Sequence, residues 1–98
     1  MKLQRHLVTS RELPEYVGRR VHVAGIVATA RHHVTAKGRP MQFVTLEDEW
    51  GLMEVTLFPG SCPQRPYLTF GPYLAAGTAE KQYDVLTVNA HSFQQAPT

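Results

Sequence analysis

The fold of this chain is decided by MQFVTLEDEWGLMEVTLFP, residues 41–59. Apolar residues alternate with other residues in both arms of this stretch, as at Val44 and Leu46 in the first arm. A period of two is typical of β-strands that bury one face. The residues at 48–51 suit a tight turn between the arms. We therefore predict a β-hairpin with one face toward a core. The other face presents Phe43, Thr45, Glu54 and Phe58.

Three further segments have the composition of β-strands. They are residues 19–35, 73–81 and 85–93, and Gly25 within the first predicts a bulge or a bend. Five strands at short spacing, the first of them long and bent, predict an all-β chain that closes into a small barrel. An SH3-like barrel has the same strand count, but the long first strand with its central glycine favours a five-stranded OB-fold. Because residues 59–66 are rich in Pro and Gly, we expect a reduced or irregular connection between strands three and four.

The 98 residues predict one domain, since a chain of this length builds one modest core. We divide it into an N-terminal arm (1–12), a single OB-fold domain (13–95) and a polar tail (96–98). No apolar run approaches the ~20 residues that span a bilayer, and the N-terminus lacks the apolar core of a secretion signal. The single cysteine, Cys62, excludes an internal disulfide and fits a reducing compartment. We therefore expect a cytoplasmic protein without membrane contact.

Charge is distributed unevenly along the chain. Residues 1–40 carry eight Lys or Arg against two acidic residues, a net charge of +6. Residues 41–98 carry two Lys or Arg against six acidic residues, a net charge of −4. A basic half suits a polyanionic partner, although scattered, solvated charges would give the same totals.

Neither a catalytic set nor a metal site is predicted. His32 and His33 are adjacent, so in a strand they face opposite sides, which is poor geometry for a shared ion. The acidic cluster at 47–49 lies in a turn, where Asp48 is expected to accept backbone N–H bonds. Ser61 lacks the flanking glycines of a nucleophile elbow. We therefore expect no enzyme activity, no metal and no cofactor.

Four segments carry a resemblance to a known family: VHVAGIV (21–27), KGRPMQFVTLEDEWG (37–51), EVTLFP (54–59) and PYLAAGTAEKQYDVLTV (72–88). Together they resemble OB-folds of the anticodon-binding type. They are most similar to the OB domain near the C-terminus of bacterial replicative DNA polymerase III α subunits. The resemblance implies a non-catalytic module that binds single-stranded nucleic acid, either within or accessory to such a polymerase. The chain departs from the family after residue 58, where a shorter Pro-rich segment replaces a helix that plugs the barrel.

A receptor for a single strand needs flat aromatic platforms and cations along one groove. The resemblance implies that Phe43 stacks a base and that Glu54 reads a base edge, as the matching residues of synthetase anticodon domains do. Glu54 would repel phosphate but would accept from an exocyclic amine. His33 would add positive charge below neutral pH. The predicted binding residues are Arg31, His33, Lys37, Arg39, Phe43, Thr45, Glu54, Phe58, Lys81 and Tyr83.

Several of these residues have a structural alternative. Phe43 would equally serve to cap the core under the N-terminal arm. Phe58, at a strand end, suits a packing role, and Tyr83 in a turn suits simple exposure. Trp50 is expected to cover one end of the barrel rather than to stack a base.

Three functions follow from this pattern. The first is a single-stranded DNA-binding module associated with replication or repair synthesis, with DNA preferred over RNA and with polymerase or replication proteins as partners. The second is an RNA- or tRNA-binding module of the same fold. The third is an OB domain that binds a basic protein and no nucleic acid.

Overall fold

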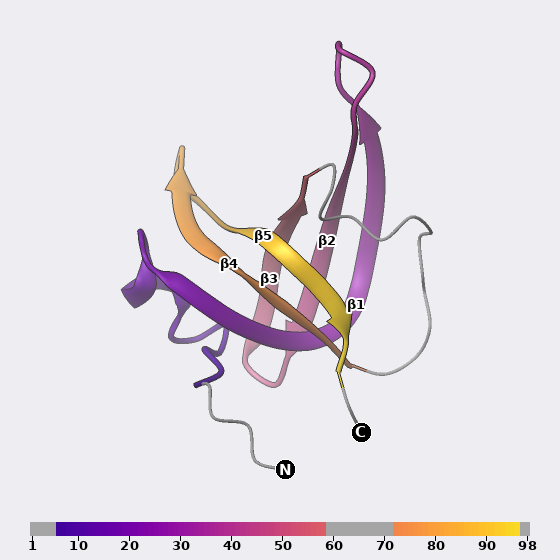
Figure 1. The fold of residues 1–98 in the computed structure, drawn as a ribbon. Coiled ribbons are helices and arrows are strands. Elements are labelled where there is room, and N and C mark those ends of the chain that lie inside the picture. The colour runs from indigo at the N-terminus through magenta and orange to yellow at the C-terminus, as the bar shows by residue number, and fades with distance from the viewer. Residues whose placement is uncertain (1–5, 59–71, 97–98) are drawn as a thin grey trace.

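The computed structural model describes residues 6–58 and 72–96, which form a closed β-barrel preceded by one turn of 3-10 helix. The elements are η1 (Leu13–Tyr16), β1 (Arg20–Val34), β2 (Pro40–Asp48), β3 (Gly51–Leu57), β4 (Pro72–Gln82) and β5 (Val85–Gln95) (Figure 1). The strand order around the barrel is β1-β2-β3-β5-β4. The β3–β5 pair is parallel, and the other four pairs are antiparallel. A five-stranded barrel of this order is an OB-fold, so the predicted fold class is confirmed.

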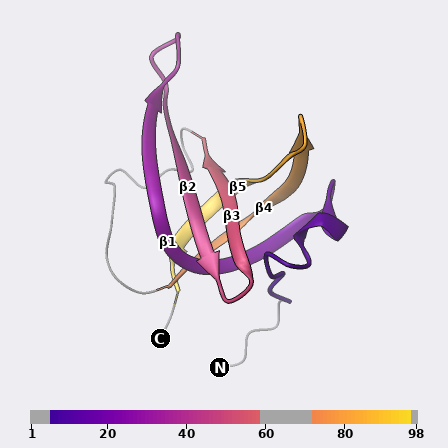
Figure 2. The ribbon, with the colours of Figure 1, turned by 180° about the vertical axis from the view of Figure 1, so that it is seen from behind.

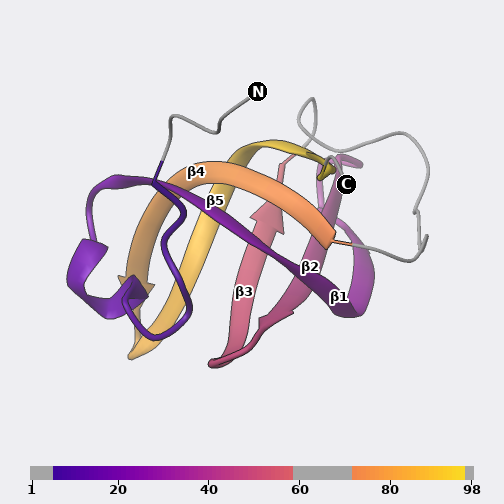
Figure 3. The ribbon, with the colours of Figure 1, turned by 90° about the horizontal axis from the view of Figure 1, so that it is seen from below.

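The long strand β1 closes the barrel by pairing on two sides. Residues 20–26 pair with β4, and residues 26–34 pair with β2. Figure 3 shows β1 running from η1 beneath the barrel toward β2. The register with β2 shifts between Val27 and Thr29, which marks a bulge. A Cβ at Gly25 would lie 2.7 Å from the backbone oxygen of Glu47, so the bend predicted there is also a point of close approach.

The core is built from every second residue of the strands, on the face that points into the barrel, as the alternation of apolar residues predicts. Val44 and Leu46 of β2 face Val55 and Met53 of β3, and all four are at most 3% exposed. In both arms of the hairpin, the alternate apolar residues that were predicted to face the core are therefore buried. Val8 of the N-terminal arm also joins this core and is 4% exposed. Residues 1–9 show no clear periodicity, so the sequence did not indicate that Val8 would join the core.

The predicted connection at residues 59–66 lies outside the described residues, as does Cys62. Within residues 6–58 and 72–96, no helix is long and apolar enough to cross a lipid bilayer. The division into an arm, a domain and a tail stays a prediction.

Asp48 fixes the β2–β3 turn and also ties the N-terminal arm to it. Its carboxylate accepts hydrogen bonds from the backbone N–H groups of Trp50 (2.9 Å) and Gly51 (3.0 Å), which confirms the predicted turn role. It also accepts from the backbone N–H of Ser10 at 2.7 Å and from its hydroxyl at 2.6 Å. Burial raises the pKa of Asp48, but these four hydrogen bonds outweigh burial and hold the pKa below its usual value.

We expect Gly25→Ala to destabilise the barrel by about 1–3 kcal/mol, because the added methyl group must displace the backbone of Glu47. Urea unfolding followed by circular dichroism measures the loss. Ala30→Ser is the control, since it adds one heavy atom at an exposed position of the same strand. Equal stabilities of the two variants would show that the approach at Gly25 does not constrain the barrel.

Asp48→Asn should lower the free energy of unfolding at neutral pH by about 1–2 kcal/mol, the value of charge-assisted hydrogen bonds at a partly exposed site. The pKa of Asp48 is lower in the folded state than in the unfolded state, about 3.9, so the stabilisation is present above that value. It is lost as the pH falls through the folded-state pKa.

Wild type and Asp48→Asn should therefore converge in stability once the pH falls below the folded-state pKa of Asp48, as measured by urea unfolding at several acidic pH values. Glu49→Gln, an exposed carboxylate of the same turn, is the control and should leave the pH profile unchanged. A gap between wild type and Asp48→Asn that persists in acid would contradict the assigned role.

Candidate nucleic-acid interface

Outward-facing residues of β1, β2 and β3 form rows across the barrel, because these strands pair side by side (Figure 2). One row consists of Arg31, Phe43 and Thr56, and in this row Thr56 has the outward parity but is buried, with 8% of its surface exposed. The next row consists of Thr29, Thr45 and Glu54. A third row, nearer the β2–β3 turn, consists of Ile26, Glu47 and Leu52. We call the surface made by these three rows the outer face.

Phe43 lies on the outer face and outside the hydrophobic core. Its ring is half-buried, with the Arg31 guanidinium carbon 5.4 Å from the ring centre. His33 follows Arg31 by two residues in β1. The centroids of the His33 and Phe43 rings lie 6.4 Å apart, and the planes of the two rings are tilted by 53°. Among the described residues, Phe43 is not one of the side chains packed against the hydrophobic core, which argues against its alternative role as a core cap. An aromatic ring flanked by a cation and an imidazole is a surface on which a nucleobase can stack.

Three polar side chains are linked by hydrogen bonds in the row beside Phe43. Thr29 Oγ1 donates to Thr45 Oγ1 at 3.1 Å, and Thr45 Oγ1 donates to Glu54 Oε2 at 3.0 Å. The direction of donation along these two hydrogen bonds is set by Glu54, because an ionised carboxylate accepts hydrogen bonds and donates none. Thr45 and Glu54 were predicted as site residues, and the structure places them directly opposite each other. Thr29 was missed, because its place in the row depends on the register shift in β1.

The basic loop 35–39 extends from the end of β1 and β2 (Figure 1). Its shape is held by Thr35, whose N–H donates to the carbonyl of Arg39 at 2.9 Å and whose hydroxyl accepts from the N–H of Arg39 at 3.1 Å. The side chains of Lys37 and Arg39 are exposed. Exposed Lys and Arg side chains of this kind are able to contact phosphate groups.

The β4–β5 turn projects from the same end of the barrel as the basic loop (Figures 1 and 2). Tyr83 is 94% exposed, and it and Asp84 have positive φ angles of 51° and 63°. Two such residues make the tight turn typical of a β-hairpin. Lys81 Nζ lies 3.9 Å from Asp84 Oδ1 across this turn. Lys81 and Tyr83 thus form a separate rim, apart from the cluster at Phe43.

Phe58 follows the last residue of β3 and is 41% exposed. It has the same parity as Glu54, as predicted, but it lies beyond the paired part of the strand. It therefore stands at the margin of the outer face.

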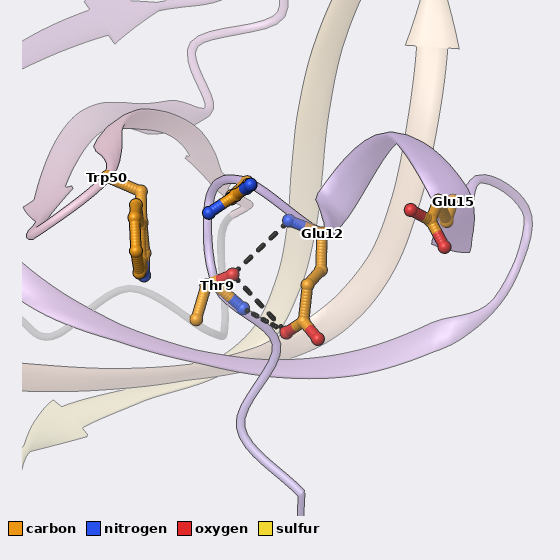
Figure 4. A pocket seen from close by; sticks show the side chains of 5 residues that line it. Thr9, Glu12, Glu15 and Trp50 are labelled. Carbon is orange, nitrogen blue, oxygen red and sulfur yellow. Dashed lines mark hydrogen bonds between the residues drawn. The ribbon is translucent and has the colours of Figure 1, made fainter.

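The β2–β3 turn forms the opposite end of the outer face and differs in charge from the basic loop. Thr9, Arg11, Glu12, Glu15 and Trp50 line a hollow of about 470 Å³ there (Figure 4). The Arg11 guanidinium carbon lies 4.8 Å from the centre of the Trp50 ring. The sequence did not indicate this contact. Trp50 is 52% exposed, so it covers the barrel end only in part. Two carboxylates in the lining, together with those of residues 47–49, make this end unfavourable for phosphate.

Among the described residues, no group of three or more His, Cys, Asp or Glu side chains is placed to hold a metal ion. His32 and His33 occupy successive positions of β1 and therefore face opposite sides, as predicted.

No protein-family model matches this chain, and no curated protein matches its sequence. Solved structures do match over 99% of it. A chain described as an aspartyl-tRNA synthetase from Leishmania major Friedlin is 18% identical, with a TM-score of 0.70. The asparaginyl-tRNA synthetase from Pyrococcus horikoshii is 16% identical, with a TM-score of 0.69.

This chain spans 22% and 24% of the length of these two synthetases. At this level of identity the similarity shows a shared fold. It agrees with the predicted OB-fold, and it adds no support for the predicted similarity to polymerase III α subunits.

Proposed function

We propose that this chain is a non-catalytic OB module that binds single-stranded RNA on its outer face. The observation that carries the proposal is the placement of Phe43, a half-buried aromatic outside the core with Arg31 beside its ring. A stacked base needs a flat platform, and its phosphate needs a cation within reach. Among the described residues, Arg31, Lys37 and Arg39 supply positive charge on that side of the barrel.

Charge supports one path for the strand across the barrel. The basic loop 35–39 attracts the backbone, and the carboxylates around the β2–β3 turn repel it. We therefore place the phosphates near the loop and near Arg31, with bases directed over Phe43 toward Glu54. Lys81 and Tyr83 form the other rim of this path, as is usual for OB-folds.

The choice of RNA over DNA rests on the similar structures, which are of enzymes named for tRNA. A folded RNA presents single-stranded loops, whose unstacked bases stack on aromatic side chains. The same face would accept the bases of single-stranded DNA, so a role beside a DNA polymerase is the second candidate. Binding of a basic protein alone is the third.

Binding of ribo- and deoxyribo-oligonucleotides of about ten nucleotides and one sequence, measured by fluorescence anisotropy, separates these functions. We expect tighter binding of RNA, and we expect affinity to fall steeply between about 50 and 200 mM salt because bound cations are released from the strand. Tighter binding of DNA would support the replication role instead. Failure of both oligonucleotides to bind at low salt would leave only protein binding.

Phe43→Ala should weaken RNA binding by about 1–3 kcal/mol, the value of stacking one base on an aromatic ring. Because Phe43 lies outside the core, the free energy of unfolding should change little. Fluorescence anisotropy and urea unfolding measure the two effects separately.

Trp50→Ala is the matched control for Phe43→Ala, since it removes a half-exposed aromatic at the acidic end of the barrel. It should leave RNA affinity unchanged. A Phe43→Ala variant that loses stability but binds RNA as wild type does would assign the ring a structural role.

A further inference from the structure

Glu54 is exposed on the outer face, and one of its two carboxylate oxygens is engaged by a hydrogen bond from a neighbouring strand. Thr45 donates its hydroxyl proton to Oε2 of Glu54 at 3.0 Å, and Thr29 in turn donates to Thr45 at 3.1 Å. The second carboxylate oxygen, Oε1, has no hydrogen-bond partner among the described residues. A carboxylate that is fixed at one oxygen and open at the other is suited to recognise a donor group.

The fixed carboxylate lies within reach of a base on Phe43. Thr45 follows Phe43 by two residues on β2, so both point outward, and Glu54 is directly opposite Thr45 on β3. Glu54 is thus the diagonal neighbour of Phe43, and such neighbours lie ~7–8 Å apart. A base that stacks on Phe43 therefore directs one edge toward the carboxylate of Glu54.

An ionised carboxylate accepts hydrogen bonds and donates none, so it discriminates among the four bases. Guanine presents two adjacent donors on its Watson–Crick edge, N1–H and the N2 amino group. Adenine and cytosine each present one amino donor beside a bare ring nitrogen, which repels the second carboxylate oxygen. Uracil presents one N–H between two carbonyl oxygens. Guanine alone meets the carboxylate with two donors and no acceptor between them.

We propose that Glu54, positioned by Thr45 and Thr29, makes the outer face selective for guanine at the position stacked on Phe43. This inference rests on the proposed function, since it specifies which base the RNA-binding face prefers. The negative charge of Glu54 is compatible with RNA binding because the phosphates are met by Arg31 and the basic loop, on the other side of Phe43.

Anisotropy titrations with RNAs of about five nucleotides that differ only in the central base test the preference. The guanine RNA should bind about tenfold tighter than the adenine, cytosine or uracil RNAs, as expected for a bidentate pair. Inosine, which lacks the N2 amino group, should lose much of this advantage. Glu54→Gln should abolish the preference, because an amide replaces one acceptor by a donor. Thr45→Val should reduce it, because Glu54 loses its hydrogen bond.

Glu49→Gln is the matched control, an exposed carboxylate at the β2–β3 turn, and it should keep the guanine preference. A preference for another base, or a guanine preference that survives Glu54→Gln, would overturn the inference. RNA binding without any base preference would overturn the inference and leave the proposed function intact. Failure of every RNA to bind would overturn both.

Discussion

The structure depends on one constraint, which is that a single strand, β1, must pair on both sides of the barrel. Its first part bonds to β4 and its second part bonds to β2, so the chain must bend between residues 25 and 29. The absence of a side chain at Gly25 allows the backbone of Glu47 to approach, and the register shift after Val27 completes the bend. Without this closure, the five strands would form an open sheet with two unpaired edges, because β2, β3, β5 and β4 still pair in that order. The outer face includes residues of β1 because β1 pairs with β2 as well as with β4.

The register shift also decides which side chains reach the outer face. Up to Val27, the odd-numbered residues of β1 point into the barrel, as Val21 and Val23 do. The extra residue at the bulge reverses this parity, so Arg31 and His33 point outward beside Phe43. An uninterrupted strand would turn the same two side chains inward, since a slip of one residue exchanges the faces of a strand. One bulge thus supplies the cation next to the aromatic ring.

The two ends of the outer face differ in charge, and this difference gives the face a direction. Lys37 and Arg39 extend beyond the β1–β2 end, whereas Glu47, Asp48 and Glu49 surround the β2–β3 turn. In the sequence this difference is visible only as a basic first half and an acidic second half. The barrel brings residues of the basic half of the chain and residues of the acidic half onto a single surface, because β1 pairs antiparallel with β2 on that surface.

The sequence by itself determined the hairpin, the five strands, the OB-fold and the outward parity of Phe43, Thr45 and Glu54, because a period of two is a local pattern. Only the tertiary structure decided the contacts that these residues make. Thr29 meets Thr45 from 16 positions away, and Ser10 meets Asp48 from 38 positions away. Such contacts depend on strand register and on where a bulge falls. Those are set by how the whole barrel closes, so no short stretch of sequence contains them.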